Sequence, residues 1–317
     1  MSNLLVVYNT CGLKQQDNTW YYIPAIESIL AQKTDFDFDV VISDCVSPQN
    51  VRSTLMKKFD GKVYFSFVDE LLPVNMTFNH AVRQTEMYVG GYSAYLYLDS
   101  GVSFATENDL QKLWDTYQSG PYAMVASKTN TDSGSENWFN SSQEGIPSII
   151  PLGKAVNLHC QIFDGEILEA YGGLMPDIFA SHCTESTFTF LCAAIKKKWA
   201  LCHDVTVNHA VSLDGASWGF NPNGQTTMQM GIETWEHLVK WAPKTMREIL
   251  ADPKVNECGM GYEEYRNVLL HDPSKYDEEG YALDHKLANF IQFNLFLWPQ
   301  DFDYNSINSF FVGDPPV

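Results

Sequence analysis

Residues that can do chemistry follow the apolar runs of this sequence. Residues 95–98 form an aromatic and aliphatic run, and Asp99, Ser100 and Gly101 come directly after it. Ligands of open α/β sheets bind in the crevice outside the carboxyl ends of the strands, so a carboxylate at such an end lies beside a ligand. Asp-Ser-Gly is also favourable turn chemistry. The run alone is therefore consistent with a ligand-binding carboxylate or with the start of a turn.

Polar residues stand at the ends of two earlier runs in the same way. Asn9 and Thr10 follow the apolar residues 4–8, and Asp44 follows residues 38–42 after a single serine. Parallel strands bring their carboxyl ends to one edge of a sheet. As polar residues at strand ends, these three are candidates for binding a ligand.

Two later segments carry further candidates. Residues 196–198 are three lysines at the end of a helical pattern, where they suit the helix dipole or would bind phosphate. Residues 212–225 are rich in Gly, Asn and Ser and contain Trp218. This segment predicts a flap with an aromatic side chain at its tip.

The elements that must position these residues alternate along the chain. The first apolar run, a helix pattern over residues 20–32 and the run 38–42 make a strand, a helix and a strand, which is the length of a right-handed βαβ unit. Further strands are predicted at residues 63–68, at the run ending in Asp99, and at 122–127, 148–152, 155–163 and 199–207. Further helices are predicted at residues 51–59, 78–87, 107–117, 164–170 and 184–198. The pattern predicts an α/β fold with a mainly parallel sheet flanked by helices.

The end of the chain differs from this alternation. Residues 129–147 lack periodicity and read as a loop, and from about residue 230 the pattern is helical. We expect one domain over residues 1–218 and a mainly helical region over residues 219–317. That region shapes the site, forms an oligomer contact or acts as a stabilising appendage.

Composition limits the classes of function. The chain has 317 residues, and 20 Lys and Arg against 39 Asp and Glu give a formal net charge of −19. Such a charge disfavours nucleic acid and anionic membrane surfaces as partners. The seven cysteines contain no C-x-x-C pair and lie mostly in apolar runs, which indicates buried thiols in a reducing compartment. No signal peptide or membrane span is predicted, and we expect a cytoplasmic protein.

The order of motifs resembles the GT-A-fold glycosyltransferases, particularly the family-two type. Residues 22–32 are similar to the family's first helix, and residues 40–44 to its strand ending in Asp. Residues 78–81 resemble the segment before its D-x-D strand, residues 96–101 resemble F-L-D-S-D, and residues 167–174 resemble its Gly-Gly segment. The resemblance covers about residues 4–210 and makes residues 1–218 a nucleotide-sugar-binding catalytic domain.

The resemblance assigns roles to the candidate residues. It implies that Asn9, Thr10 and Asp44 hold the base and ribose of the donor. It also makes Asn79 a donor-binding residue. Asp99, Ser100 and Gly101 would hold the donor's diphosphate with a divalent cation, Mn²⁺ or Mg²⁺. Trp218 would close over the donor or acceptor.

Two departures from the family pattern concern the metal and the base. Gly101 stands where the second Asp of D-x-D would bind the cation, so an oxygen ligand is missing. His209 occupies about the position of a histidine that completes the metal site in some members, with His203 and Asp204 as rivals. Of the acidic pair only Glu185 remains, at a helix start that suits a general base or a helix cap.

The sequence therefore predicts a glycosyltransferase that moves a sugar from a nucleotide-diphosphate sugar to a hydroxyl of a glycan, protein, small molecule or modified nucleobase. One alternative is an inactive relative that binds a sugar or a partner. A second alternative is a nucleotidyltransferase, but the segment after the first strand has only one glycine and one lysine before residue 15, where that class carries a glycine-rich basic loop.

Overall fold

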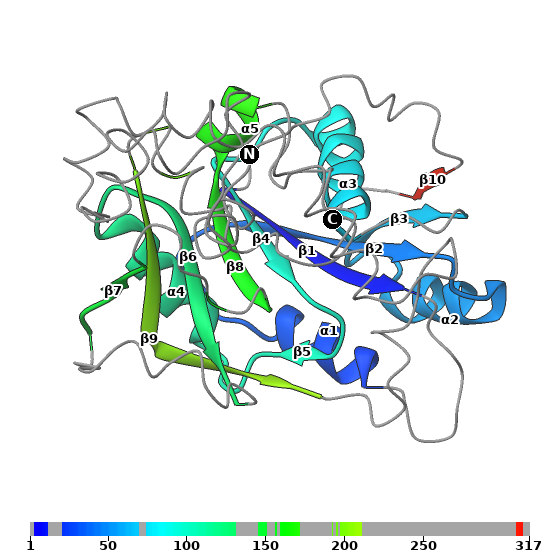
Figure 1. Cartoon of the computed structure of the whole chain (residues 1–317). Helices are drawn as coiled ribbons and strands as arrows, with labels where there is room; N and C mark the ends of the chain where they lie inside the picture. The colour runs from blue at the N-terminus through cyan, green and yellow to red at the C-terminus, as the bar shows by residue number, and fades with distance from the viewer. Residues whose placement is uncertain are drawn as a thin grey trace, which may run out of the picture.

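The protein is built on one mixed sheet, seen in a computed structural model that describes residues 3–11, 21–69, 74–130, 145–150, 156, 159–171, 192, 195, 197–210 and 309–312. The strands run in the order β10-β3-β2-β1-β4-β8-β6-β9-β5, and β7 pairs with β9 (Figure 1). The described strands are β1 (Leu4–Cys11), β2 (Phe38–Cys45), β3 (Tyr64–Val68), β4 (Ala94–Leu98), β5 (Val102–Ser103), β6 (Tyr122–Thr129), β7 (Ser148–Ile149), β8 (Cys160–Asp164), β9 (Lys198–His209) and β10 (Ser309–Val312).

The half of the sheet around β1 is parallel, as predicted. β1 pairs in parallel with both β2 and β4, and β2 pairs in parallel with β3. β8 is inserted antiparallel between β4 and β6, and β6 pairs in parallel with β9. The start of β8 therefore meets the carboxyl end of β4, since antiparallel neighbours run in opposite directions.

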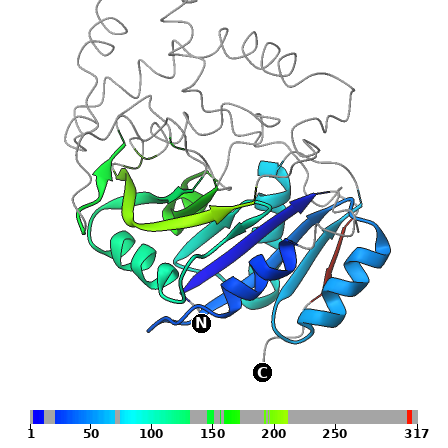
Figure 2. The same cartoon turned by 90° about the horizontal axis from the view of Figure 1, so that it is seen from below.

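Helices cover both faces of the sheet. They are α1 (Tyr22–Leu30), α2 (Gln49–Phe59), α3 (Val74–Val89), α4 (Asp109–Gln118) and α5 (Gly165–Tyr171). The apolar sides of α1, α2 and α4 share one core with alternate residues of the strands, and these three helices lie on one face in Figure 2. α3 packs on the opposite face, where Phe78 contacts Tyr97 of β4 and Phe163 of β8. Because both faces are covered, residues 4–8 of β1 are all fully buried, which explains their continuous apolar run.

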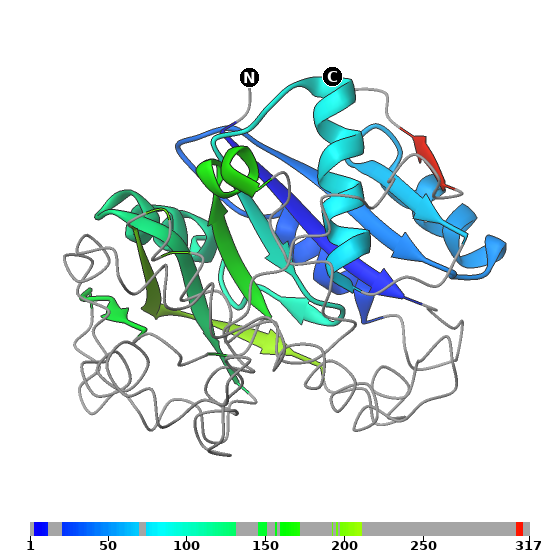
Figure 3. The same ribbon diagram turned by 45° about the horizontal axis from the view of Figure 1, so that its top comes forward.

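Four residues near the end of the chain join the sheet. Ser309–Val312 forms β10, which pairs antiparallel with β3 at the edge of the sheet (Figure 3). These four residues belong to the region expected to be mainly helical. Residues 211–308 and 313–317 lie outside the described residues. The division at residue 218 stays a prediction. No described helix has the length and apolar character needed to cross a membrane.

The lysines 196–198 were predicted at a helix terminus, and the structure corrects this for two of them. Lys198 is the first residue of β9, and Lys197 precedes it outside any helix. Nζ of Lys197 donates a hydrogen bond of 2.7 Å to Asp164 and lies 3.0 Å from Glu166. Asp164 is in register with Ala94, the first residue of β4. Lys197 is therefore at the opposite end of β4 from Asp99 and does not serve a phosphate there.

The described cysteines agree with the expected thiols. Cys45, Cys160, Cys192 and Cys202 are buried thiols that take part in no disulfide. Burial raises the pKa of the Cys160 thiol to about 12, so this side chain stays neutral and packs as an apolar group.

Candidate functional site

Asp99 both begins a turn and presents a carboxylate at the edge of the sheet. Its carbonyl accepts the N–H of Val102, which closes the turn after β4. Its Oδ1 accepts the N–H of Ser100 at 2.8 Å and the hydroxyl of Tyr97 at 3.3 Å. The side chain is 34% exposed. The two sequence readings of Asp99 are thus compatible, because the turn fixes one oxygen and leaves Oδ2 for other partners.

Gly101 is required by the backbone of this turn. Its φ is +82°, and a Cβ there would lie 3.0 Å from the carbonyl oxygen of Ala210 and 3.3 Å from the ring of Tyr21. Its N–H donates to the hydroxyl of Tyr8 at 3.1 Å, and its carbonyl accepts the N–H of Ala210 at 3.0 Å. An aspartate in the D-x-D position would therefore be strained and crowded. The departure from the motif follows from how closely β9 approaches the turn.

That approach brings His209 to the site. β5 pairs antiparallel with the end of β9, with Val102 opposite His209. The N–H of His209 donates to Oδ1 of Asn130 at 2.9 Å. The sequence assigned Asp99 and His209 to a shared metal site, and the fold brings the two side chains together.

His159 joins them and was missed by the sequence reasoning. Its carbonyl accepts the N–H of Asp99 at 2.9 Å, and its Nδ1 lies 3.5 Å from Oδ2 of Asp99. The rings of His159 and His209 are 4.3 Å apart between centroids. One ligand atom from each of Asp99, His159 and His209 lies within 4.8 Å of the others. No local signal marks His159, because it stands at the start of antiparallel β8 and reaches the site only through strand pairing.

The donor set of this cluster fits a divalent cation. It offers one carboxylate oxygen and two imidazole nitrogens, which are ligands of first-row transition ions. Nδ1 of His159 is buried and has no hydrogen-bond partner among the described residues. A buried nitrogen that makes no hydrogen bond is costly, and a metal ion would relieve that cost.

Asn9 lies beside this cluster at the end of β1. It is buried, and its Nδ2 donates to the carbonyl oxygens of Val7 and Leu98, both at 3.3 Å. In the part of the chain that the structure describes, its Oδ1 is buried without a partner. The amide is thus anchored to β4 and keeps one acceptor for a ligand or a water molecule.

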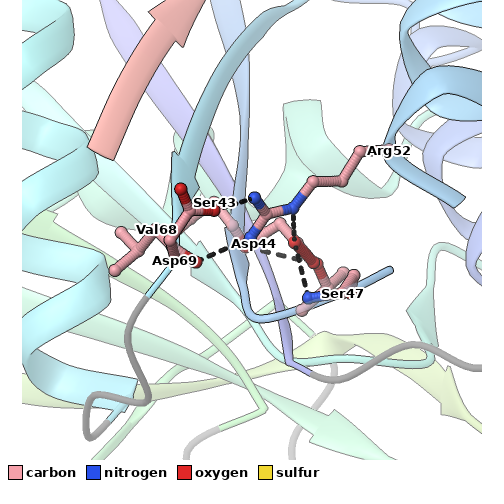
Figure 4. A network of polar contacts seen from close by, with 7 residues as sticks. Ser43, Asp44, Ser47, Arg52, Val68 and Asp69 are labelled. Atoms are coloured by element: carbon pink, nitrogen blue, oxygen red, sulfur yellow. Dashed lines mark hydrogen bonds and ion pairs between the residues drawn. The ribbon is translucent and has the colours of Figure 1, made fainter. Parts of the chain in front are cut away.

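Asp44 lies in a closed network of polar contacts (Figure 4). Arg52 of α2 donates from Nε to Oδ2 of Asp44 at 3.0 Å, and both side chains are almost fully buried. The hydroxyl of Thr10 donates to the other oxygen at 3.0 Å, and the N–H of Ser47 donates to Oδ2 at 3.3 Å. Burial raises the pKa of Asp44, whereas Ser47, Arg52 and Thr10 oppose that shift. Thr10 and Asp44 come together as predicted, but the carboxylate is enclosed by protein groups, and its contact with a nucleotide base stays a prediction.

Arg52 extends the same network to the end of β3. Its Nη1 donates to Oδ1 of Asp69 at 2.5 Å, and its Nη2 donates to the carbonyl of Val68 at 2.6 Å. Its guanidinium carbon lies 5.0 Å from the centre of the Phe67 ring. The arginine therefore joins the ends of β2 and β3, a role that no motif in the sequence predicts.

The remaining predicted residues are distributed as follows. Asn79 is buried on α3, and the hydroxyl of Ser100 lies 3.5 Å from that of Tyr21. His203 contacts the hydroxyl of Ser148 at 2.7 Å, and Asp204 accepts the N–H of Gly145 at 2.9 Å, so neither rival joins the cluster. Glu185 and Trp218 lie outside the described residues, and their roles stay predictions.

A comparison with solved structures supports the fold, whereas two searches by sequence find no match. No protein-family model matches the sequence, and no curated protein matches it. The crystal structure of S. aureus TarS is similar with a TM-score of 0.50 at 14% identity, over 86% of this chain and 45% of that chain. This chain thus spans less than half of TarS.

Two further solved structures align less closely. The mannosyltransferase PcManGT from Pyrobaculum calidifontis, in complex with GDP-Man and Mn²⁺, gives a TM-score of 0.48 at 15% identity, over 92% and 85% of the two chains. S. aureus TarS 1-349 in complex with UDP gives 0.47 at 13% identity, over 82% and 75%. The chain has a GT-A-like fold, as predicted, and at this identity the likeness concerns the fold alone.

Proposed function

We propose that the protein is a glycosyltransferase that moves a sugar from a nucleoside-diphosphate sugar to a hydroxyl acceptor. The observation that carries this proposal is the position of Asp99, at the carboxyl end of β4 in a GT-A-like sheet, with two histidines beside it. A cation held there would neutralise the charge that builds up on the departing diphosphate.

The chain's own residues divide the work around this point. Asp99, His159 and His209 would hold the cation, and the turn at Ser100 and Gly101 would keep the carboxylate in place. Asn9 offers its acceptor Oδ1, which has no partner among the described residues. Thr10, Asp44 and Asn79 would shape the side of the site that receives the base and ribose.

The reaction exchanges one carbon–oxygen bond for another. The bond from the anomeric carbon to the diphosphate breaks, and a bond from that carbon to the acceptor oxygen forms. The acceptor proton passes to a base, for which we propose the carboxylate of Glu185. Trp218 would close over the donor and keep water from taking the acceptor's place.

A donor panel tests the proposal. The full chain is incubated with UDP-, GDP- and TDP-sugars, with and without Mn²⁺, and release of nucleoside diphosphate and the shift in Tm are measured. We expect one donor to give both signals and Asp99→Asn to remove the release. Asp115→Asn, on the exposed side of α4, is the matched control and keeps it. The absence of release and of any thermal shift with every donor would show that the protein is not a glycosyltransferase.

A thermal shift without release would favour the alternative of a sugar-binding relative. The same assay with nucleoside triphosphates and sugar phosphates, read as pyrophosphate release, tests the nucleotidyltransferase alternative.

A further inference from the structure

We infer that Asp99, His159 and His209 form a metal site of two imidazoles and one carboxylate, which binds ions such as Co²⁺ and Zn²⁺ in strong preference to Mg²⁺. His159 and His209 supply the ligands that a second carboxylate would otherwise supply. The inference deepens the proposed function by naming the class of ion, but metal binding by itself does not depend on which reaction the site performs.

The ligand atoms of the three residues lie close to the distances that a single ion requires. Ligand atoms about 2.1 Å from one ion are roughly 3 to 3.5 Å apart. Oδ2 of Asp99 and Nδ1 of His159 are already 3.5 Å apart, and the group of three lies within 4.8 Å. A closure of about 1 Å by the His209 ring therefore completes the set. Side-chain rotation covers such a distance without movement of the strands.

Backbone hydrogen bonds hold the three ligand residues in place. The N–H of Asp99 is bonded to the carbonyl of His159, which joins the two residues across β4 and β8. The N–H of His209 is bonded to Asn130, and its strand is bonded to the turn at Gly101. Ser100 and Tyr97 take up Oδ1 of Asp99 and leave Oδ2 facing His159. The site is thus preorganised, which reduces the entropy lost when an ion binds.

The chemistry of the donor atoms disfavours Mg²⁺. Mg²⁺ prefers oxygen ligands and gives up its water reluctantly, whereas imidazole nitrogen suits Zn²⁺, Cu²⁺, Ni²⁺ and Fe²⁺. The affinity of a given nitrogen and oxygen site for these ions rises from Mn²⁺ through Fe²⁺, Co²⁺ and Ni²⁺ to Cu²⁺ and falls again at Zn²⁺. A site with one carboxylate also leaves one net positive charge on a bound divalent ion. That charge suits an anionic diphosphate in a protein whose formal charge is −19.

The packing around position 101 disfavours a second carboxylate there. A Cβ at position 101 would meet the carbonyl of Ala210 at 3.0 Å. The bond between these two residues is also what holds the end of β9, and therefore His209, at the turn. An aspartate at 101 would therefore strain the contact that brings His209 to the site.

Metal binding to the full chain tests the inference without any sugar donor. After treatment with EDTA, the protein is titrated with CoCl₂, MnCl₂, ZnCl₂ and MgCl₂ in a calorimeter, and the visible spectrum of the Co²⁺ form is recorded. We expect one equivalent of Co²⁺ to bind, with Kd at least about 100-fold lower than that of Mg²⁺. His159→Ala and His209→Ala should each weaken Co²⁺ binding by about tenfold or more, because even indirect partners of a metal contribute that much.

Two controls keep the test decisive. His203→Ala removes a histidine of the same strand that contacts Ser148 instead, and it should bind Co²⁺ like the parent protein. His159→Gln keeps the size of the side chain if the alanine variant does not fold. Equal binding of Co²⁺ by the parent and the His159 variants would overturn the inference, and so would a Kd for Mg²⁺ equal to that for Co²⁺. A thiolate spectrum that persists without His159 would assign the ion to cysteines and would also overturn it.

The outcomes separate this inference from the proposed function. Selective metal binding without turnover of any donor supports the site and contradicts the reaction. Turnover with unchanged activity in EDTA, together with no Co²⁺ binding, supports the reaction and contradicts the site.

Discussion

The N–H of Ala210 donates a hydrogen bond of 3.0 Å to the carbonyl of Gly101, and this contact ties the end of β9 to the turn after β4. It explains why the motif that begins at Asp99 ends in glycine. It also places His209 opposite Val102 and therefore next to Asp99. A position that looks degenerate in the sequence is thus occupied by the one residue that the packing accepts.

Gly101→Asp should therefore damage the protein and not restore a D-x-D site. The side chain must adopt φ of +82° and displace Ala210 or Tyr21. We expect the free energy of unfolding to fall by about 2–4 kcal/mol, from the left-handed backbone and the overpacking together. Gly61→Asp is the matched control, because Gly61 has φ of +65° but no atom within 4 Å of a Cβ. Urea unfolding that gave equal losses for the two variants would contradict the steric account.

Removal of the Arg52 guanidinium should be among the most destabilising changes in the described fold. Arg52→Met leaves the carboxylate of Asp44 buried without its cation, since that side chain is fully enclosed. We expect a loss of about 3–5 kcal/mol in the free energy of unfolding. The double variant Arg52→Met with Asp44→Asn removes the unpaired charge and should recover part of the loss. A double-mutant cycle in urea measures the coupling, and additive losses would contradict the ion pair's role.

His80 should make the fold less stable in acid. Burial, and then the charge of Arg83, lower the pKa of this side chain from 6.5 to about 4. The unfolded chain therefore takes up the proton first, so stability is full above pH 6.5 and is lost as the pH falls toward 4. The largest loss from this residue is about 3 kcal/mol.

His80 belongs to a hydrogen-bond network that includes Ser309 of β10. Ser66 donates to Gln84, Gln84 donates to the hydroxyl of Ser309, and that hydroxyl contacts Nε2 of His80 at 2.8 Å. His80→Gln removes the titrating group, and its unfolding free energy should vary less between pH 7 and pH 4.5 than that of the parent. The parallel loss of stability in both proteins would assign the acid effect to other groups.

We predict that the buried amide of Gln161 makes the fold less stable than an apolar side chain of the same shape would. It is fully buried on β8 between Tyr97 of β4 and Ala126 of β6. Both polar atoms of its amide lack a partner among the residues that are described. Gln161→Met keeps the shape and should raise the free energy of unfolding by about 1–3 kcal/mol. Gln84→Met is the matched control, and it should be destabilising because both ends of that amide are hydrogen-bonded, one to Ser66 and one to Ser309. Destabilisation by both changes would indicate that Gln161 has a bound partner, such as water.

Much of the fold is readable from local pattern. Residues 4–8 are apolar without alternation because β1 is covered on both faces, and the helical spacing of Tyr22, Ile26 and Ile29 matches the buried side of α1. The boundaries shift by a few residues, as with α3, which begins at Val74 instead of Phe78. Such shifts are expected, because caps and neighbouring chain decide where an element starts.

The edge strand β10 shows where local pattern fails. Ser309–Val312 is too short to carry a period, and its partner β3 lies at the other end of the sequence. Its pairing depends on the open edge of β3 and on the contact of Ser309 with His80 and Gln84. None of these is visible within a window of the sequence.

Local pattern was enough to predict that Asp99 follows a buried strand of an α/β sheet and that Asn9, Thr10 and Asp44 lie at strand ends. The groups that surround these side chains became known only from the folded chain. It added His159 to Asp99 and His209 and enclosed Asp44 with Arg52. The physical reason is that burial and periodicity are properties of single strands, whereas a site depends on strand register, and register is set by pairing between distant parts of the chain.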